Sequence, residues 1–302
     1  MSDVRLAYLI GTDHCGSTLT SFLLDAHSDI VGVGESTPPL QWFTSDYICG
    51  CGLPVKDCPF YTEISTRLAE QGLAFSADQW SINFSYSNQF LHRWLTQYAS
   101  QHAKRRLQSL QDRYLPFHNT RVKKVKQVAL EYMRAATDIA GASLMCDTSK
   151  CLARLTHLHS MPEVDVHLIW LIRDARAFAH SCKKFGLSIE KSSREWVRYQ
   201  RLAGEIFETF EAGRRLRISY EDLCETPRHR LFEIHDFLGV EREPLPDTLD
   251  RKQHHVLGNK MRKGGPLEVR LDEKWRRELS DQERRHVLTI AGELNRNLGY
   301  AD

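Results

Sequence analysis

The feature that most constrains this chain is an apolar run followed at once by a glycine-containing loop and a helical pattern. Leu6 to Ile10 read as a buried strand, and the loop begins at Gly11. Gly11, Gly16, Ser17 and Thr18 have the spacing of a phosphate-binding loop, where backbone N–H groups at a helix N-terminus hold a phosphate. Ser17 stands where a nucleotide triphosphatase carries lysine. The pattern indicates a phosphate site without its usual cation; a turn without a ligand is the alternative.

Apolar runs and helical patterns alternate along most of the chain. Further strands are expected in residues 29–36, 142–150, 164–176 and 216–223. Helices are expected in residues 17–26, 175–184, 193–211 and 227–237, and a capping box of Ser280 and Glu283 opens a last helix. Residues from about 60 to 140 carry no strand pattern and read as a helical insertion. We therefore expect one α/β domain over residues 1–302, with a P-loop-like, doubly wound, mostly parallel sheet flanked by helices.

Polar motifs follow the first four expected strands. These strands end at Gly11, Glu35, Asp147 and Arg173, and a Ser-Lys pair ending in Lys150 follows Asp147 closely. In doubly wound sheets, ligands bind outside the carboxyl ends of the strands. The sequence therefore predicts that a glycine loop, a carboxylate and two cations meet at one edge.

A second anion anchor is expected from Arg173 and Ser181. Arg173 ends a buried strand, and Ser181 lies eight residues later, about two turns along the next helix. A guanidinium and a hydroxyl at these positions could share one phosphate. Pairing of Arg173 with Asp174, or a cap on the strand end, is the structural alternative. With the first loop, the pair indicates a nucleotide that has two separated phosphate positions.

Five motifs in order together resemble the sulfotransferase family. They are GTDHCGSTLTSFLLDAHSDIVGVGES, DTSK, LIRDARAFAHS, ISYEDL and GNKMRKGG. The resemblance covers most of the chain outside the insertion, and bacterial sulfotransferases are the nearest parallels, with tyrosylprotein sulfotransferases more distant. It implies 3′-phosphoadenosine-5′-phosphosulfate (PAPS) as sulfuryl donor, 3′,5′-ADP as product and no required metal.

The resemblance also implies which residues hold the donor. The loop residues Gly11, His14, Cys15, Gly16, Ser17 and Thr18 would bind the 5′-phosphosulfate. Arg173 and Ser181 would bind the 3′-phosphate, with Tyr220 near the nucleotide and Arg262 and Lys263 in a loop that folds over it. Cys15 is expected to stand in for the small serine usual in such loops, with a nucleophilic cysteine as the alternative. For Tyr220, a buried aromatic at a strand end is the alternative.

Three residues are candidates for the catalytic roles. Glu35 follows His14 by 21 residues, the offset of a general base in tyrosylprotein sulfotransferases, so it is expected to take the acceptor's proton. Family members usually carry arginine or lysine at the position of His14, whose charge depends on pH. Lys150 therefore becomes the expected permanent cation. The alternatives are a structural Glu35 with His14 as the base, and a surface position for Lys150.

Composition limits the partners and the compartment. A net charge of +2 does not suggest nucleic-acid binding, and no apolar run approaches the length of a membrane span. The amino-terminal residues lack the pattern of a signal peptide. Eight cysteines without such a signal read as reduced thiols, so a cytoplasmic location is expected.

Three cysteines gather in the segment CGCGLPVKDCPF: Cys49, Cys51 and Cys58. A structural zinc site generally needs four ligands, and only three cysteines occur locally. A compact reduced loop beside the acceptor pocket is the favoured interpretation, with zinc or a disulfide as alternatives.

The expected function is transfer of a sulfuryl group from PAPS to a hydroxyl or amine by in-line displacement. The acceptor could be a small molecule, a carbohydrate or a peptide, and the insertion is expected to frame its site. Two rivals remain: a P-loop kinase of small molecules, and a non-catalytic nucleotide-binding protein. Neither the acceptor nor the oligomeric state can be read from the sequence.

Overall fold

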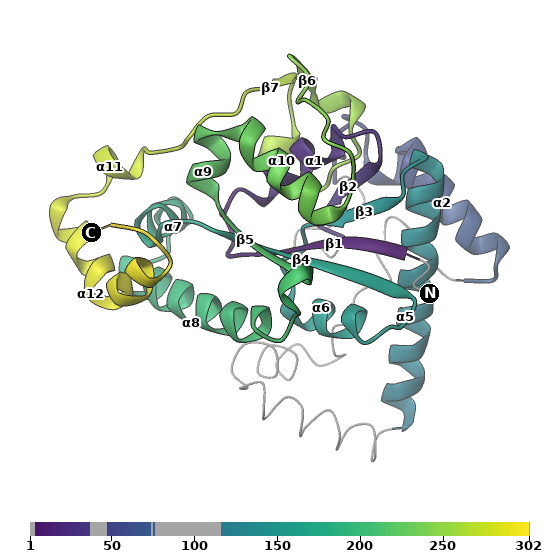
Figure 1. Ribbon diagram of the computed structural model, residues 1–302, viewed down its shortest axis with the longest axis horizontal. Helices are drawn as coiled ribbons and strands as arrows, with labels where there is room; N and C mark the ends of the chain where they lie inside the picture. Colours follow the sequence, from purple (N-terminus) through teal and green to yellow (C-terminus); the bar gives the residue numbers. More distant parts are fainter. Residues whose placement is uncertain (1–3, 37–46, 74, 76–115, 302) are drawn as a thin grey trace.

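A five-stranded parallel sheet forms the centre of the protein (Figure 1). The computed structural model describes residues 4–36, 47–73, 75 and 116–301. The strands are ordered β2-β3-β1-β4-β5 and all pair in parallel. They span β1 Val4–Ile10, β2 Ile30–Gly34, β3 Leu144–Asp147, β4 Val164–Ile172 and β5 Arg215–Ser219. The sequence expectation of a doubly wound parallel sheet is confirmed.

Helices cover both faces of the sheet because its central strands are apolar on both sides (Figure 1). In β1, Leu6, Tyr8 and Ile10 face one core, and Ala7 and Leu9 face the other. The helices on the Leu9 side are α1 Ser17–Asp25, α9 Tyr220–Glu225 and α10 Pro227–Leu238. The helices on the Tyr8 side are α2 Pro59–Glu70, α5 Pro116–Ala140, α6 Leu152–His159, α7 Ala175–Lys183, α8 Ile189–Phe207 and α12 Asp281–Asn297. No helix within the described ranges is both long and apolar enough to cross a membrane.

Capping side chains explain where several elements begin and end. Ser280 and Glu283 form the expected capping box at the start of α12. Helix α8 begins four residues earlier than expected because the Ser188 side chain accepts a hydrogen bond from the Lys191 N–H. The expected strand over residues 216–223 is too long: Ser219 caps α9, so the sequence from Tyr220 onward is helical.

The region expected to be an insertion is helical where it is described. Helices α2 and α5 pack on each other, and residues 76–115 lie outside the described residues. The carboxyl-terminal half of α5 belongs to the main core, where Val128 and Met133 are buried. This part of α5 therefore belongs to the helical layer of the domain, and along the chain it comes between β2 and β3. That the region frames an acceptor site stays a prediction.

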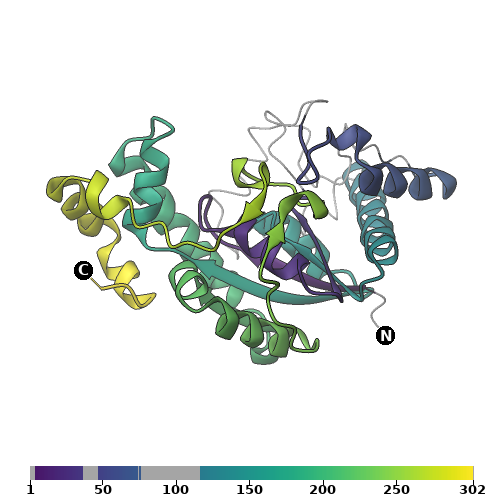
Figure 2. The same cartoon turned by 90° about the horizontal axis from the view of Figure 1, so that it is seen from above.

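A segment after α10 returns across the carboxyl edge of the sheet. It contains β6 Leu249–Asp250, which pairs antiparallel with β7 Pro266–Leu267, and the short helices η3 Arg251–Gln253 and η4 Lys260–Arg262. Seen from above, this yellow-green segment lies beside α1 (Figure 2). Leu257 bridges Gly34 at the end of β2, and its N–H donates to Val33 O. This bridge fixes the segment against the strand end that carries Glu35.

We expect Gly34→Ala to destabilise the protein far more than Gly72→Ala. Both glycines have φ of +70°, but a Cβ on Gly34 would lie 1.9 Å from Leu257 O, whereas one on Gly72 meets nothing within 4 Å. The left-handed backbone costs about 1–2 kcal/mol in both variants, and overpacking adds about 1–3 kcal/mol at Gly34 only. Urea denaturation measures both. Equal losses would show that Leu257 can move away freely.

Candidate active site

The loop between β1 and α1 packs too tightly for side chains at its two glycines. A Cβ on Gly11 would lie 2.6 Å from Leu171 O, and one on Gly16 would lie 2.4 Å from the Tyr220 ring. Gly16 also has φ of 98° and precedes Ser17, the first residue of α1. The first N–H groups of a helix have no intrahelical partner, so this loop presents donors and a positive helix end to an anion.

Lys150 supplies the cation that the loop's own sequence lacks. Its ammonium donates to Glu35 Oε1 at 2.6 Å, to Ser17 Oγ at 3.2 Å and to Thr148 O at 3.3 Å. Burial lowers the pKa of Lys150, but the carboxylates of Glu35 and Asp13 outweigh burial and hold this pKa above its ordinary value. Lys150 is only 8% exposed, so the surface alternative is wrong. A permanent positive charge therefore stands beside the loop where Ser17 replaces lysine.

The backbone at the candidate catalytic residues is strained. His14 and Lys150, each with φ of 60°, are the only non-glycine residues with positive φ in the part of the chain that the structure describes. The Tyr199 hydroxyl from α8 donates to Lys150 O at 2.8 Å and accepts from Gly11 N–H at 3.1 Å. Such strain persists where the surroundings enforce it, and it concentrates at functional sites. One tyrosine therefore holds the loop and the Lys150 turn together.

The surroundings of His14 disfavour the charged form of its side chain. Its ring stacks on Phe185, with centroids 5.1 Å apart and planes 13° apart. Burial lowers the pKa of His14, and the positive charges of Arg173 and Lys150 lower it further against the opposing carboxylates. An uncharged imidazole can still donate a hydrogen bond, but Lys150 carries the charge.

Cys15 is not equipped to act as a nucleophile. Its side chain is fully buried, and burial raises the pKa of the Cys15 thiol to about 11. A thiol is reactive as its thiolate, which is scarce here near neutral pH. The structure is consistent with the expected role of Cys15 as a small residue in the loop.

Arg173 and Ser181 lie on one cavity of about 800 Å³, together with His14, Gly16 and Tyr220. The Arg173 guanidinium lies 4.3 Å from the centre of the Tyr220 ring and donates to His14 O at 2.7 Å and to Asp272 O at 3.1 Å. Its buried Nε has no hydrogen-bond partner among the described residues. Asp174 pairs with Arg176 instead, so the expected alternative of an Arg173–Asp174 pair is wrong. The Arg173 guanidinium and the Ser181 hydroxyl therefore line one cavity, where they could bind an anion.

The cavity also has basic residues that the sequence motifs did not identify. Its lining includes Arg270, Lys274, Arg276 and Arg277, along with Asn259 and Met261. The acidic residues Asp272 and Glu273 also line it, and Glu273 pairs with Arg276 at 2.6 Å. The basic run KWRR was the available signal, but it is far from the phosphate loop in sequence.

The two basic residues expected over the nucleotide are placed differently. Arg262 is buried and donates to Ile48 O and Gly258 O, each at 2.5 Å, and its guanidinium lies over the Tyr47 ring. It therefore holds its own loop together in this conformation. Lys263 is exposed, and neither residue is among those that line the cavity. Contact of Arg262 and Lys263 with a nucleotide stays a prediction.

The fold is one that solved sulfotransferase domains share. The sulfotransferase domain of the Synechococcus PCC 7002 olefin synthase has a TM-score of 0.56 and 19% identity, over 97% of this chain and 95% of that chain. The sulfotransferase domain from the curacin biosynthetic pathway has a TM-score of 0.52 and 16% identity, over 97% and 98%. No protein-family model and no curated protein sequence matches the chain. The resemblance seen in the motifs is thus confirmed for the P-loop-like fold.

We expect the His14 imidazole to titrate below its ordinary pKa of 6.5, because burial and two nearby cations disfavour its charged form. Lys150→Met should raise this pKa, whereas Lys191→Met, an exposed position on α8, should leave it unchanged. NMR titration of the imidazole signals, assigned with His14→Gln, measures both. Titration above 6.5 in the unaltered protein would contradict this placement.

Proposed function

We propose that this protein is a sulfotransferase that moves a sulfuryl group from PAPS to a hydroxyl or amine. The observation that carries the proposal is the position of Lys150, whose Nζ lies 3.2 Å from Ser17 Oγ at the phosphate loop and 2.6 Å from Glu35. A cation, an anion-binding helix end and a carboxylate are thereby assembled at one point. Sulfuryl transfer needs all three groups. The helix end and the cation bind the donor and hold the charge that develops, and the carboxylate takes the proton.

The cavity beside the loop supports a donor with a second phosphate. Arg173 and Ser181 line it, and four further basic residues surround them. The unpartnered Arg173 Nε is a buried donor available to a phosphate oxygen. A 3′-phosphate in this cavity and a 5′-phosphosulfate at the loop would use both anion sites of the protein at once.

In the proposed mechanism Glu35 removes the proton from the acceptor as its oxygen or nitrogen attacks sulfur in line. The bond between sulfur and the 5′-phosphate oxygen breaks, and 3′,5′-ADP leaves. Lys150 and the α1 N-terminus hold the negative charge that develops on that oxygen. The Glu35 side chain is 19% exposed, so the carboxylate is accessible, and Lys150 Nζ donates to its Oε1. No protein-bound intermediate is part of this reaction.

The proposal includes a cytoplasmic location and a small-molecule, carbohydrate or peptide acceptor. The eight cysteines, all within the described ranges, form no disulfide, which supports this proposed location, because disulfides are rare in reducing compartments. The acceptor would approach Glu35 from the side opposite the nucleotide cavity, because the displacement is in line.

We expect 3′,5′-ADP to raise the melting temperature well beyond 5′-AMP, because only the former has a 3′-phosphate. A hundredfold difference in affinity corresponds to about 2.7 kcal/mol at saturating nucleotide, which thermal shift detects readily. Ser181→Ala should reduce the difference. Ser65→Ala removes an equivalent hydroxyl, bonded to the carbonyl four residues earlier in α2, and should not.

The same thermal-shift series separates the rivals. A shift with ATP and magnesium that exceeds the shift with 3′,5′-ADP would favour a kinase. Binding of 3′,5′-ADP without turnover of PAPS on any acceptor would favour a non-catalytic nucleotide-binding protein. Equal shifts from 3′,5′-ADP and 5′-AMP would contradict the proposed 3′-phosphate site.

Glu35→Gln should lower turnover by about 10²–10⁴-fold, the usual contribution of a positioned general base. Glutamine keeps the shape of the side chain but cannot take the proton. Affinity for 3′,5′-ADP should change little, and the loss should shrink for acidic phenols and persist for aliphatic alcohols. Glu63→Gln, an exposed position on α2, is the matched control.

The opposite pattern would assign a structural role to Glu35. Its signs are a lower melting temperature, weaker nucleotide binding and equal losses for all acceptors. Assays of labelled sulfate transfer with a phenol and an alcohol series distinguish the two patterns.

A further inference from the structure

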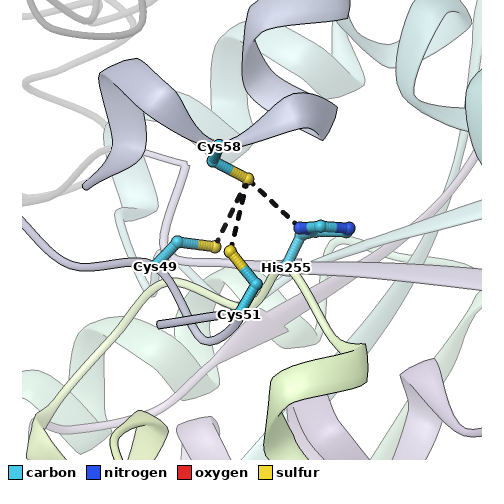
Figure 3. A group of neighbouring side chains, drawn as sticks. All are labelled: Cys49, Cys51, Cys58 and His255. Carbon is cyan, nitrogen blue, oxygen red and sulfur yellow. Dashed lines mark hydrogen bonds between the residues drawn. The ribbon is translucent and has the colours of Figure 1, made fainter. Parts of the chain in front are cut away.

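Four side chains that can bind a metal meet beside the end of β2 (Figure 3). Cys49 and Cys51 come from the loop before η1 (Val55–Asp57), and Cys58 immediately precedes α2. His255 comes from the returning segment and lies 197 residues after Cys58. The three cysteines are close in sequence, whereas His255 becomes their neighbour only in the folded chain.

The ligand atoms have the spacing of a tetrahedral site. Cys58 Sγ lies 3.7 Å from Cys51 Sγ, 3.8 Å from Cys49 Sγ and 3.2 Å from His255 Nδ1. All four atoms lie within 4.8 Å of one another. Zinc bonds sulfur at about 2.3 Å and nitrogen at about 2.0 Å, which places tetrahedral ligands roughly 3.5–3.8 Å apart. One ion at the centre can therefore reach all four.

A disulfide does not account for this arrangement. A disulfide joins two sulfur atoms at about 2.05 Å, and the sulfur atoms here are 3.7 and 3.8 Å apart. It would also leave one cysteine and His255 unused. An iron–sulfur cluster would divide its ligands between metal atoms and spread them farther apart.

The local fold directs these groups inward. Gly52, with φ of 90°, completes a tight turn in which Cys49 N–H donates to Leu53 O. The His255 ring stacks on Phe60, with centroids 4.9 Å apart and planes 6° apart, and its Nδ1 faces Cys58. A turn and a stacked ring thus hold the ligands before any ion binds.

We propose that Cys49, Cys51, Cys58 and His255 bind one zinc ion in a closed structural site. Three thiolates and an imidazole are the ligands that zinc accepts in structural sites, and soft thiolates disfavour magnesium and calcium. With four protein ligands the ion has no open position for a substrate. It stabilises the fold and takes no part in sulfuryl transfer, so the proposal does not depend on the proposed function.

The ion would fasten the returning segment to the end of β2. Gly50 N–H donates to Val256 O, next to His255, and the Tyr61 hydroxyl donates to His255 O at 2.7 Å. Leu257, the residue after Val256, donates its N–H to Val33 O and accepts from Glu35 N–H. The four ligands would therefore stabilise the contact between the returning segment and the end of β2.

Elemental analysis of untagged protein, purified without chelators and passed through gel filtration, tests the proposal directly. We expect about one equivalent of zinc per chain. Cys58→Ser and His255→Gln should lose most of it. Cys151→Ser and His229→Gln, a cysteine outside the cluster and an exposed histidine, are the matched controls and should retain it.

A second measurement needs no variant, in case the substitutions prevent folding. Cys51 is partly exposed, so as a free thiol it should react with iodoacetamide in the native protein. A zinc-bound Cys51 should be protected until 1,10-phenanthroline removes the ion. Removal of the ion should also speed hydrogen exchange at the Leu257 and Glu35 amides. Their N–H groups form the hydrogen bonds between the returning segment and the end of β2.

The outcomes separate clearly. Zinc at one equivalent, protection of Cys51 and loss in the two ligand variants would support the site. Three results would overturn it. They are zinc-free protein in which all three thiols react, a disulfide between two of the three cysteines, and iron in place of zinc. Because none of these readouts requires sulfuryl transfer, a failed metal site and a failed sulfotransferase proposal give different results.

Discussion

The contact between Lys150 Nζ and Glu35 Oε1 is the interaction on which the rest of the site depends. Taking a charged pair out of water is costly unless the two charges face each other and hydrogen bonds satisfy what remains. Here Ser17 Oγ and Thr148 O complete the surroundings of the ammonium. Loss of either partner would leave an uncompensated buried charge. The ends of β2 and β3 and the start of α1 must therefore keep their relative positions, and the left-handed backbone at Lys150 is maintained for the same reason.

Two further contacts hold the elements around the Lys150–Glu35 pair in place. The Tyr199 hydroxyl joins the first loop to the Lys150 turn from the α8 side. On the other side, the bridge between Gly34 and Leu257 brings the returning segment onto the strand that leads to Glu35. The cavity lined by Arg173 and Ser181 lies where that segment, the loop and α7 meet, so its shape follows from these contacts rather than from one motif.

Most of the fold could be predicted from local patterns. The five strands, the helix after the glycine loop and the capping box at Ser280 follow from residues close in sequence, because apolar period and capping act over a few positions. Errors arose at element ends, as at Ser219, whose side chain caps a helix where the strand was expected to continue. For the site, the ends of the first four strands predicted the convergence of Glu35, Lys150 and Arg173 correctly, since parallel strands end at one edge. They could not predict that the Arg262 guanidinium donates to the carbonyls of Ile48 and Gly258.

The sequence by itself determined the architecture and the position of the glycine loop between β1 and α1, because strand alternation and glycine spacing are encoded over short distances. The sequence indicated Lys150 as the cation, but only the tertiary structure shows which groups its ammonium contacts there. Lys150 Nζ contacts Ser17 Oγ from 133 residues away, because β3, which precedes Lys150, pairs with β1, which precedes the loop. Tertiary structure also decided that His255 completes the cysteine cluster, 197 residues after Cys58. Contacts of this range depend on how loops cross the sheet edge, and no local spacing records them. The sequence determines the chemistry of each side chain, and tertiary packing determines which side chains become neighbours.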